Sequence, residues 1–254
     1  MKNALITVCA RKGADEAGSK NLKTICGLPL VYYSLSAADL YCRSCADVSA
    51  DICLNTDSDM LANVVIEKYP EVYRIRRSAK LSGGSVPKED VYRDCVVKME
   101  KKLGKHYDLI IDLDITSPLR LDTDIQNIVD LFLNSPETDV VMSACESRRN
   151  PYYNMARIDR NGFAGQIIDN RNTALAQAPA CYDVNGSLYV FSRDFLINRM
   201  TFDLWQGRVK LYKMIGTGFF DIGDENEYMM MEALAAYLFG NVEGYKRIKD
   251  NIRQ

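Results

Sequence analysis

The chain alternates between short apolar runs and longer segments whose apolar residues recur at helical spacing. Residues 5–10 (Leu-Ile-Thr-Val-Cys-Ala) are rich in β-branched side chains, which is typical of a strand buried on both faces. Pro29 opens a helical pattern through Ala38, and proline is favoured in the first turn of a helix. The same patterns predict further strands at 51–55, 72–76, 109–114, 139–144, 188–191 and 210–214, and helices beginning near 58, 88, 122 and 224, with Gly104 and Gly240 as stops.

Regular alternation of strands and helices is the pattern of a parallel α/β fold. We therefore expect an α/β protein with a doubly wound, mostly parallel sheet, in which residues 1–254 form a single domain. Residues 150–182 break the pattern, because their segments are shorter and Asn161-Gly162 is a hairpin turn signal. We interpret this region as a small protruding arm that covers a site or pairs with another subunit.

The composition argues against nucleic-acid and membrane partners. The 254 residues are 47% hydrophobic and 26% charged with a net charge of −2, as in an ordinary globular protein. This balance gives no sign of a nucleic-acid or membrane partner. No apolar run approaches the roughly 20 residues that a membrane span needs, and the chain starts with no cleavable signal pattern. We therefore expect a cytoplasmic protein.

Five of the eight cysteines, Cys9, Cys53, Cys95, Cys145 and Cys181, lie in apolar surroundings and are expected to be buried, reduced thiols, because free cysteine is among the most buried residue types. Cys42 and Cys45 form an isolated C-x-x-C pair, whereas a zinc site needs further ligands at suitable spacing. The only histidine, His106, lies in a polar turn between helix and strand. A histidine-based catalytic triad is therefore disfavoured.

The loop after the first strand is the first candidate for chemistry. In open α/β sheets ligands bind beyond the carboxyl ends of the strands, where this loop leaves the sheet. Arg11 and Lys20 there suit phosphate oxygens, one as a planar fork and the other as a mobile point charge. The alternative is an ordinary solvated turn.

Two places offer carboxylates. Asp112 and Asp114 are two apart on a buried strand, so their side chains leave the same face and require a cation or several donors. Asp114 is either a metal ligand or a cap for the following turn. Asp221, after Phe219-Phe220, is either a metal ligand or a cap near the last helix.

Several motifs, in order and at suitable spacing over about residues 4–235, resemble those of the acylneuraminate cytidylyltransferases, which make CMP-sialic acids from CTP. The most specific is the run of residues 116–120, Thr-Ser-Pro-Leu-Arg, after a buried strand. The others are Arg11, Ser19-Lys20-Asn21-Leu22, Gly27-Leu28-Pro29-Leu30, Thr56-Asp57, Asn185-Gly186-Ser187-Leu188-Tyr189 and Asp221-Ile222-Gly223.

The resemblance implies a Rossmann-like nucleotidyltransferase fold whose arm forms a homodimer. It implies transfer of CMP from CTP to the anomeric hydroxyl of a sialic-acid-like (nonulosonic) sugar acid, with release of pyrophosphate. The catalytic residues would be Arg11, Lys20 and Asp221, with Mg²⁺ held by Asp221 and Asp114. The substrate-binding residues would be Asn21, Arg77, Ser82, Asp114, Thr116, Ser117, Asn185 and Tyr182.

The chain also departs from the family pattern. Asp15 and Glu16 stand where a lysine is usual, Gly84 replaces an aspartate, and Gly223 replaces the second aspartate of the metal pair. Asp114 replaces a glutamine. Two alternatives follow: a sugar-1-phosphate nucleotidyltransferase of the same fold that uses another nucleoside triphosphate, or a nucleotide-binding homologue without catalysis.

Overall fold

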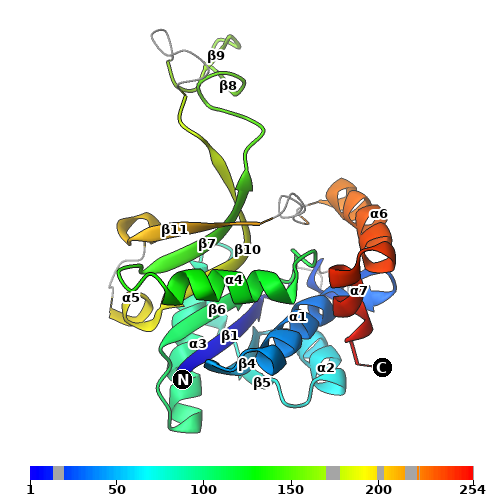
Figure 1. Cartoon of the computed structure of the whole chain (residues 1–254). Coiled ribbons are helices and arrows are strands. Elements are labelled where there is room, and N and C mark those ends of the chain that lie inside the picture. Colours follow the sequence, from blue (N-terminus) through cyan, green and yellow to red (C-terminus); the bar gives the residue numbers. More distant parts are fainter. Residues whose placement is uncertain (14–19, 170–177, 199–202, 215–221, 223, 254) are drawn as a thin grey trace.

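A seven-stranded sheet forms the centre of the molecule (Figure 1). The computed structural model describes residues 1–13, 20–169, 178–198, 203–214, 222 and 224–253. The strand order is β11-β7-β10-β6-β1-β4-β5, and only β10 runs antiparallel to its neighbours. These strands are β1 (Lys2–Ala10), β4 (Val48–Thr56), β5 (Tyr73–Arg76), β6 (Leu109–Leu113), β7 (Val140–Glu146), β10 (Tyr182–Ser192) and β11 (Val209–Lys213). The expected mostly parallel α/β sheet is confirmed.

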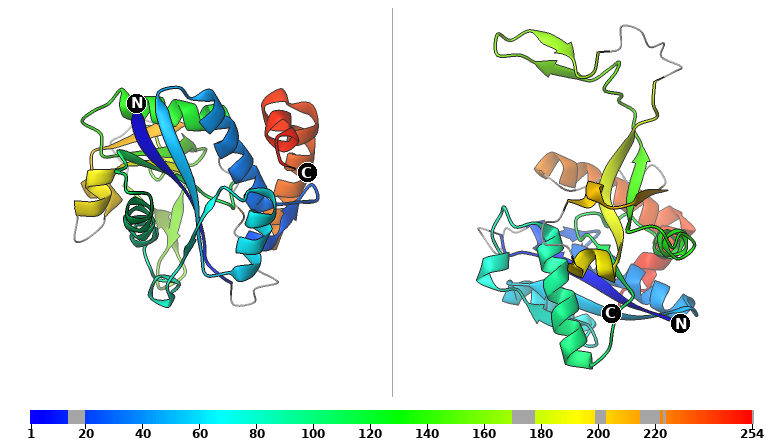
Figure 2. Two further views of the ribbon diagram at one scale, coloured as in Figure 1. Left: turned by 90° about the horizontal axis from the view of Figure 1, so that it is seen from below. Right: turned by 90° about the vertical axis from the view of Figure 1, so that its left-hand side faces the viewer.

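Helices cover both faces of this sheet (Figures 1 and 2). One face carries α1 (Leu30–Ser44), α2 (Asp59–Lys68) and α4 (Asp122–Leu133), and α6 (Glu225–Asn241) and α7 (Glu243–Asp250) pack beyond α1. The other face carries α3 (Lys88–Leu103) and α5 (Arg193–Asn198). The alternation of β1 explains the two layers, because Ala4, Ile6 and Val8 join the first core and Leu5 joins the second.

Local signals fix the helix ends. The Ser58 side chain accepts a hydrogen bond from the Leu61 amide (3.1 Å) and caps α2. Gly104 ends α3 in the left-handed region at φ +64°, a conformation that glycine adopts without strain. Asp224 caps α6 and exchanges side-chain bonds with Glu227, which is a capping box.

A thin arm projects from the far ends of β7 and β10 (Figures 1 and 2). Its tip is a hairpin of β8 (Ala156–Ile158) and β9 (Ala164–Gln166), with Gly162 in the turn at φ +86°. The Asn-Gly signal therefore placed this hairpin correctly. Its apolar side chains are exposed, including Ile158 (75%) and Phe163 (73%).

Several elements differ from the sequence prediction. Helix α6 continues past Gly240 to Asn241, and α7, α5 and a small ribbon of β2 (Thr24–Ile25) and β3 (Leu28–Pro29) were not expected. Gly240 lies on the exposed side of its helix, where glycine costs only about 1 kcal/mol relative to alanine and does not force an end.

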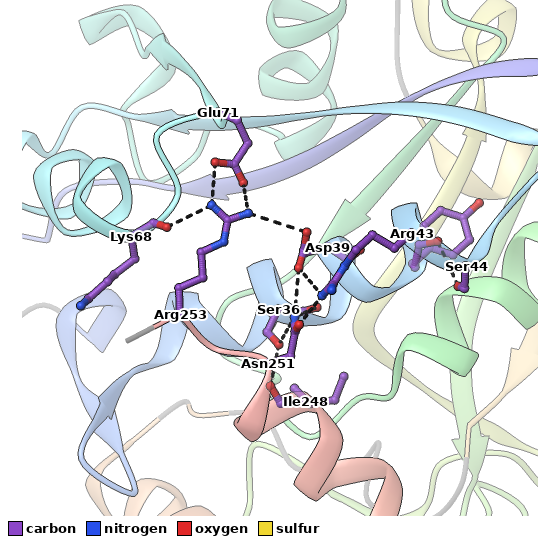
Figure 3. Close-up of polar contacts among 10 residues, drawn as sticks. Ser36, Asp39, Arg43, Ser44, Lys68, Glu71, Ile248, Asn251 and Arg253 are labelled. Atoms are coloured by element: carbon purple, nitrogen blue, oxygen red, sulfur yellow. Dashed lines mark hydrogen bonds and ion pairs between the residues drawn. The ribbon is translucent and has the colours of Figure 1, made fainter.

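A polar network docks the C-terminal segment onto α1 (Figure 3). The Asn251 amide donates to the backbone oxygen of Ser36 (3.3 Å), to its hydroxyl (3.1 Å) and to Asp39 (3.1 Å). Arg253 forms a two-pronged ion pair with Glu71 (2.9 and 2.6 Å). These bonds, with apolar packing of Tyr245 and Ile248 of α7, fix the C-terminal helices against the core.

All eight cysteines are free thiols, as expected, but of the five expected to be buried only Cys53, Cys95 and Cys145 are, whereas Cys9 and Cys181 are partly exposed. Cys42 and Cys45 form no disulfide, and the described residues contain no cluster of three metal-ligating side chains. Within the described ranges, no helix has the length and apolar character needed to cross a membrane.

Candidate active site

A cleft of about 370 Å³ lies beyond the carboxyl ends of β1, β5 and β6, which Arg11, Arg77 and Asp114 follow directly. This is the edge at which open α/β sheets bind ligands. Six residues proposed from the sequence line it together: Arg11, Lys20, Asn21, Arg77, Asp114 and Thr116. The other lining residues are Cys9, Ala10, Leu81, Gly83, Gly84, Val86, Lys88 and Val91.

The loop after β1 returns to the cleft through a short 3-10 helix, Lys20–Leu22. The Asn21 side chain donates to the backbone oxygen of Arg11 (3.0 Å) and closes the loop. The Lys20 ammonium donates to the backbone oxygen of Ile222 (3.0 Å), whose own amide donates to the backbone oxygen of Thr116 (3.3 Å). Lys20 thus bridges two sides of the cleft.

Arg77 is fixed in the cleft wall. Its side chain is buried, and it donates to the Asn55 side chain (2.7 Å) and to the Asn55 backbone oxygen (3.1 Å). Ser82 lies in an adjoining hollow that Asp57 also lines, and its hydroxyl donates to the Ser78 backbone oxygen (3.0 Å). Ser82 therefore borders the cleft without lining it.

Gly84 permits close approach of the Arg11 guanidinium. A Cβ atom at position 84 would lie 3.1 Å from Nη1 of Arg11, a contact tighter than most side chains make. Glycine at this position therefore leaves room for the Arg11 guanidinium at the cleft. A larger residue at this position would push the guanidinium aside.

Asp112 of β6 and Asp114, which follows the strand, have different partners on α3. Asp112 is buried and accepts from the hydroxyls of Thr7 (2.8 Å) and Tyr92 (2.7 Å). Asp114, just beyond the strand, pairs with Lys88. Lys88 and Tyr92 are four residues apart on α3, which is a rise of about 6 Å. Asp114 and Asp112 are two residues apart in an extended segment, which is a rise of about 6.6 Å. The two pairs are therefore spaced alike, and each helix residue meets one aspartate.

The surroundings of these two aspartates shift their pKa values in opposite directions. Burial raises the pKa of Asp112. Burial would also raise the pKa of Asp114, but the Lys88 charge and the bonds from Lys88 and Thr116 outweigh it and lower the pKa to about 2. Burial alone would lower the pKa of Lys88, but attraction to Asp114 and Asp112 outweighs burial and raises that pKa. Asp114 and Lys88 are therefore both charged at neutral pH.

Of the run of residues 116–120, only Thr116 lines the cleft, whereas Ser117 and Arg120 are buried. The Thr116 amide and hydroxyl both donate to one Asp114 oxygen (2.8 and 2.6 Å). The Ser117 hydroxyl is buried and makes no hydrogen bond in the described structure. Arg120 is fully buried and donates to the hydroxyls of Ser34 (3.0 Å) and Ser187 (3.2 Å) and to the Asp114 backbone oxygen.

Tyr182 and Asn185 lie away from this cleft, at the start of β10. The Asn185 oxygen accepts from the Ser143 hydroxyl (2.6 Å), and the Lys213 ammonium lies 4.7 Å from the centre of the Tyr182 ring. Lys213 lines a second hollow of about 440 Å³ at the base of the arm, with Cys145, Glu146, Arg148, Arg149, Asp183 and Met214. Both residues border this hollow, so the structure does not bring them together with Arg11 and Lys20.

The metal expectation rests on Asp221, which lies outside the described residues. Asp224 caps α6. The helix cap considered as an alternative role for Asp221 is therefore already supplied by another residue. Asp114 is an oxygen donor of the type that Mg²⁺ prefers, but Lys88 and Thr116 already occupy its oxygens. The described cleft therefore fits a metal ion only partly.

Lys88 is the cleft residue that the sequence analysis missed. A signal existed: a lysine opens α3, where the positive end of the helix dipole disfavours a cation. Such a cation needs nearby carboxylates, and the unusual pair Asp112 and Asp114 was already noted.

A mostly parallel sheet with a cation-lined cleft at the ends of β1, β5 and β6 is the arrangement of an α/β nucleotide-binding enzyme. Comparison with known families agrees with this class. Residues 5–213 match the family described as cytidylyltransferase, and the chain belongs to this family. It is a nucleotidyltransferase of the acylneuraminate cytidylyltransferase type.

Curated relatives span nearly the whole chain. It is 32% identical to the CMP-N,N'-diacetyllegionaminic acid synthase of Campylobacter jejuni over 92% of this chain and 95% of that protein. It is 30% identical to the post-translational flagellin modification protein B of Campylobacter coli, with the same coverage. Among solved structures, CMP:2-keto-3-deoxy-manno-octonic acid synthetase in complex with CTP aligns with a TM-score of 0.63 at 17% identity, covering 92% of this chain and 98% of that chain. This last match supports the fold.

Proposed function

We propose that this protein transfers CMP from CTP to the anomeric hydroxyl of a nonulosonic, sialic-acid-like sugar acid. The hydroxyl oxygen bonds to the α-phosphorus, the bond from that phosphorus to the bridging oxygen breaks, and pyrophosphate leaves. The observation that carries this proposal is the cation-lined cleft of a cytidylyltransferase-family chain. The legionaminic acid synthase among its relatives supports the choice of sugar class.

The proposed roles follow from the chemistry of each side chain. Arg11 and Lys20 hold the triphosphate, because phosphoryl-type transfer depends on positioning and charge neutralisation. Asn21, Arg77 and Thr116 bind the nucleotide beside them, with Ser82 at the border and Ser117 buried next to Thr116 in the chain.

Mg²⁺ is the proposed cofactor, held by Asp221 together with phosphate oxygens. Magnesium commonly uses only one or two carboxylates in addition to substrate phosphates, so a single aspartate is compatible with such a site. When bound, the ion neutralises developing charge on the phosphates. Asp114 as a second ligand stays a prediction, and it would require Lys88 to leave its carboxylate.

CTP is expected to stabilise the protein more than other nucleotides do. At about 100 times its Kd, CTP should add about 2.7 kcal/mol to the free energy of unfolding. For a chain of this size that is a rise in Tm of about 5–10 °C. Thermal denaturation with CTP, UTP, GTP and ATP in parallel measures this. A larger rise with another nucleotide would favour a sugar-1-phosphate nucleotidyltransferase.

We also propose that residues 1–254 form one domain and that its arm, residues 150–182, pairs two copies into a homodimer. Isolated hairpins are marginal in water, and this one exposes Ile158 and Phe163 almost completely. Burial of these side chains against a second copy would stabilise both the arm and the dimer.

Changing Ile158 and Phe163 together to aspartate is expected to convert a dimer into a monomer, because each buried carboxylate would lack a partner. Light scattering during size-exclusion chromatography measures the mass. Arg157→Gln, an exposed polar change on the same hairpin, serves as the control and should leave the mass unchanged. A wild-type protein that is monomeric at high concentration would contradict the proposal.

A further inference from the structure

Lys88 occupies an unfavourable position for a cation and is nevertheless held there. It is the first residue of α3, where the helix dipole opposes positive charge. Its ammonium pairs with Asp114, and the buried Asp112 lies two residues back, in β6. The arrangement places an ammonium in the wall of the cleft, next to Asp114 and Thr116.

Asp114 is itself rigidly placed. One of its oxygens accepts from the Thr116 amide (2.8 Å) and hydroxyl (2.6 Å), and the other accepts from Lys88. Arg120 holds the Asp114 backbone oxygen from beneath. The carboxylate thus has fixed partners on both oxygens, and its described contacts orient the ammonium.

Lys88 retains capacity for a ligand. An ammonium has three N–H donors, and the described hydrogen bond to Asp114 uses one of them. Its side chain is about half exposed (53%) and lines the cleft, whereas Arg77 is buried and committed to Asn55. Lys88 is therefore better placed than Arg77 to meet an anion inside the cleft.

We propose that Lys88 is a substrate-binding cation of this enzyme and that Asp114 is its positioning residue. The ligand is an anionic oxygen, either a phosphate oxygen of the nucleotide or the carboxylate of the sugar acid. This inference rests on the proposed function for the identity of the two substrates. It gives Asp114 a role that does not require a metal ion.

The test compares Lys88→Met and Lys88→Gln with Lys88→Arg, which keeps a cation. Lys101→Met, which changes an exposed lysine at the other end of α3, is the matched control. Isothermal titration with CTP in EDTA measures nucleotide binding without metal and without turnover. Steady-state kinetics with the sugar acid that gives turnover measure its KM. Circular dichroism checks that each variant is folded.

A phosphate contact predicts that Lys88→Met and Lys88→Gln weaken CTP binding by about tenfold or more, the loss expected for a charge-assisted hydrogen bond. A carboxylate contact predicts unchanged CTP binding and a similar rise in the KM for the sugar acid. In either case Lys88→Arg should keep most of the wild-type affinity for the affected substrate, and Lys101→Met should match the wild-type protein. Folded Lys88 variants with wild-type values for both substrates would overturn the proposal.

Asp114→Asn separates the positioning role from a metal role. If Asp114 positions Lys88, this variant should weaken the same substrate as Lys88→Met, and its half-saturating Mg²⁺ concentration should stay unchanged. A shift in the Mg²⁺ requirement without a change in substrate binding would overturn the assignment. If wild-type protein shows no turnover, the proposed function fails, but the CTP titration still decides whether Lys88 binds the nucleotide.

Discussion

Replacement of Asp221 by alanine is expected to lower kcat for nucleotidyl transfer by about a thousandfold or more, with the fold intact. Charge neutralisation on the transferred group supplies effects of this size in phosphoryl transfer. Asp221 would provide the carboxylate that holds Mg²⁺ against the phosphates. Its described neighbour Ile222 contacts both Lys20 and Thr116 of the cleft through its backbone.

The measurement is pyrophosphate release at saturating CTP and sugar acid, together with a Tm for each variant. Asp224→Ala is the matched control, because Asp224 caps α6 through the Glu227 amide (2.9 Å). It should cost about 1 kcal/mol of stability and leave turnover close to wild type. Retained turnover in Asp221→Ala would remove Asp221 from the catalytic residues.

The largest expected loss of stability comes from Arg120→Met. This guanidinium is fully buried, and it satisfies the hydroxyls of Ser34 and Ser187 and the backbone oxygen of Asp114. Removing it leaves the hydroxyls of Ser34 and Ser187 without this donor and the Asp114 backbone oxygen with one described donor, the Ser34 hydroxyl, so the free energy of unfolding is expected to fall by about 3 kcal/mol. Because the arginine joins α1 and β10 to Asp114, which lines the cleft, CTP binding should weaken as well.

Urea denaturation followed by circular dichroism measures the free energy of unfolding. The control is Arg76→Met, since Arg76 is exposed at the end of β5 and should change stability by less than about 0.5 kcal/mol. Equal stability of Arg120→Met and Arg76→Met would contradict the structural role assigned to the run of residues 116–120.

Hydrophobic patterning located the sheet strands well because they are short, apolar and bounded by turn residues. It did not reveal that β10 runs antiparallel between β6 and β7, because the side-chain pattern of a strand carries no direction. It also missed α7, whose eight residues Glu243–Asp250 are mostly polar and are held by packing on α1 and by the network around Asn251. Tertiary contacts, and not local propensity, place that helix.

For the site, the motifs placed Arg11, Lys20, Asn21, Arg77, Asp114 and Thr116 at one cleft because each follows a parallel strand or its adjoining loop. The partner of Asp114 could not be derived in the same way. Lys88 reaches it only because one helical turn of α3 matches two residues of β6, and this match depends on how helix and sheet pack. Tyr182 and Asn185 do not line the cleft because the first residues of β10 extend along the end of β7, where Tyr182 pairs with Glu146 at the base of the arm.

The central claim is the reaction, and its most direct test is pyrophosphate release by the wild-type protein with Mg²⁺ and CTP. The acceptors are a panel of sialic, legionaminic, pseudaminic and 3-deoxy sugar acids, each with a no-acceptor control. We predict release that depends on one class of nonulosonic acid, with the matching CMP-sugar detected by mass spectrometry. CTP binding without release across the whole panel would contradict the proposed function and favour a nucleotide-binding homologue without catalysis.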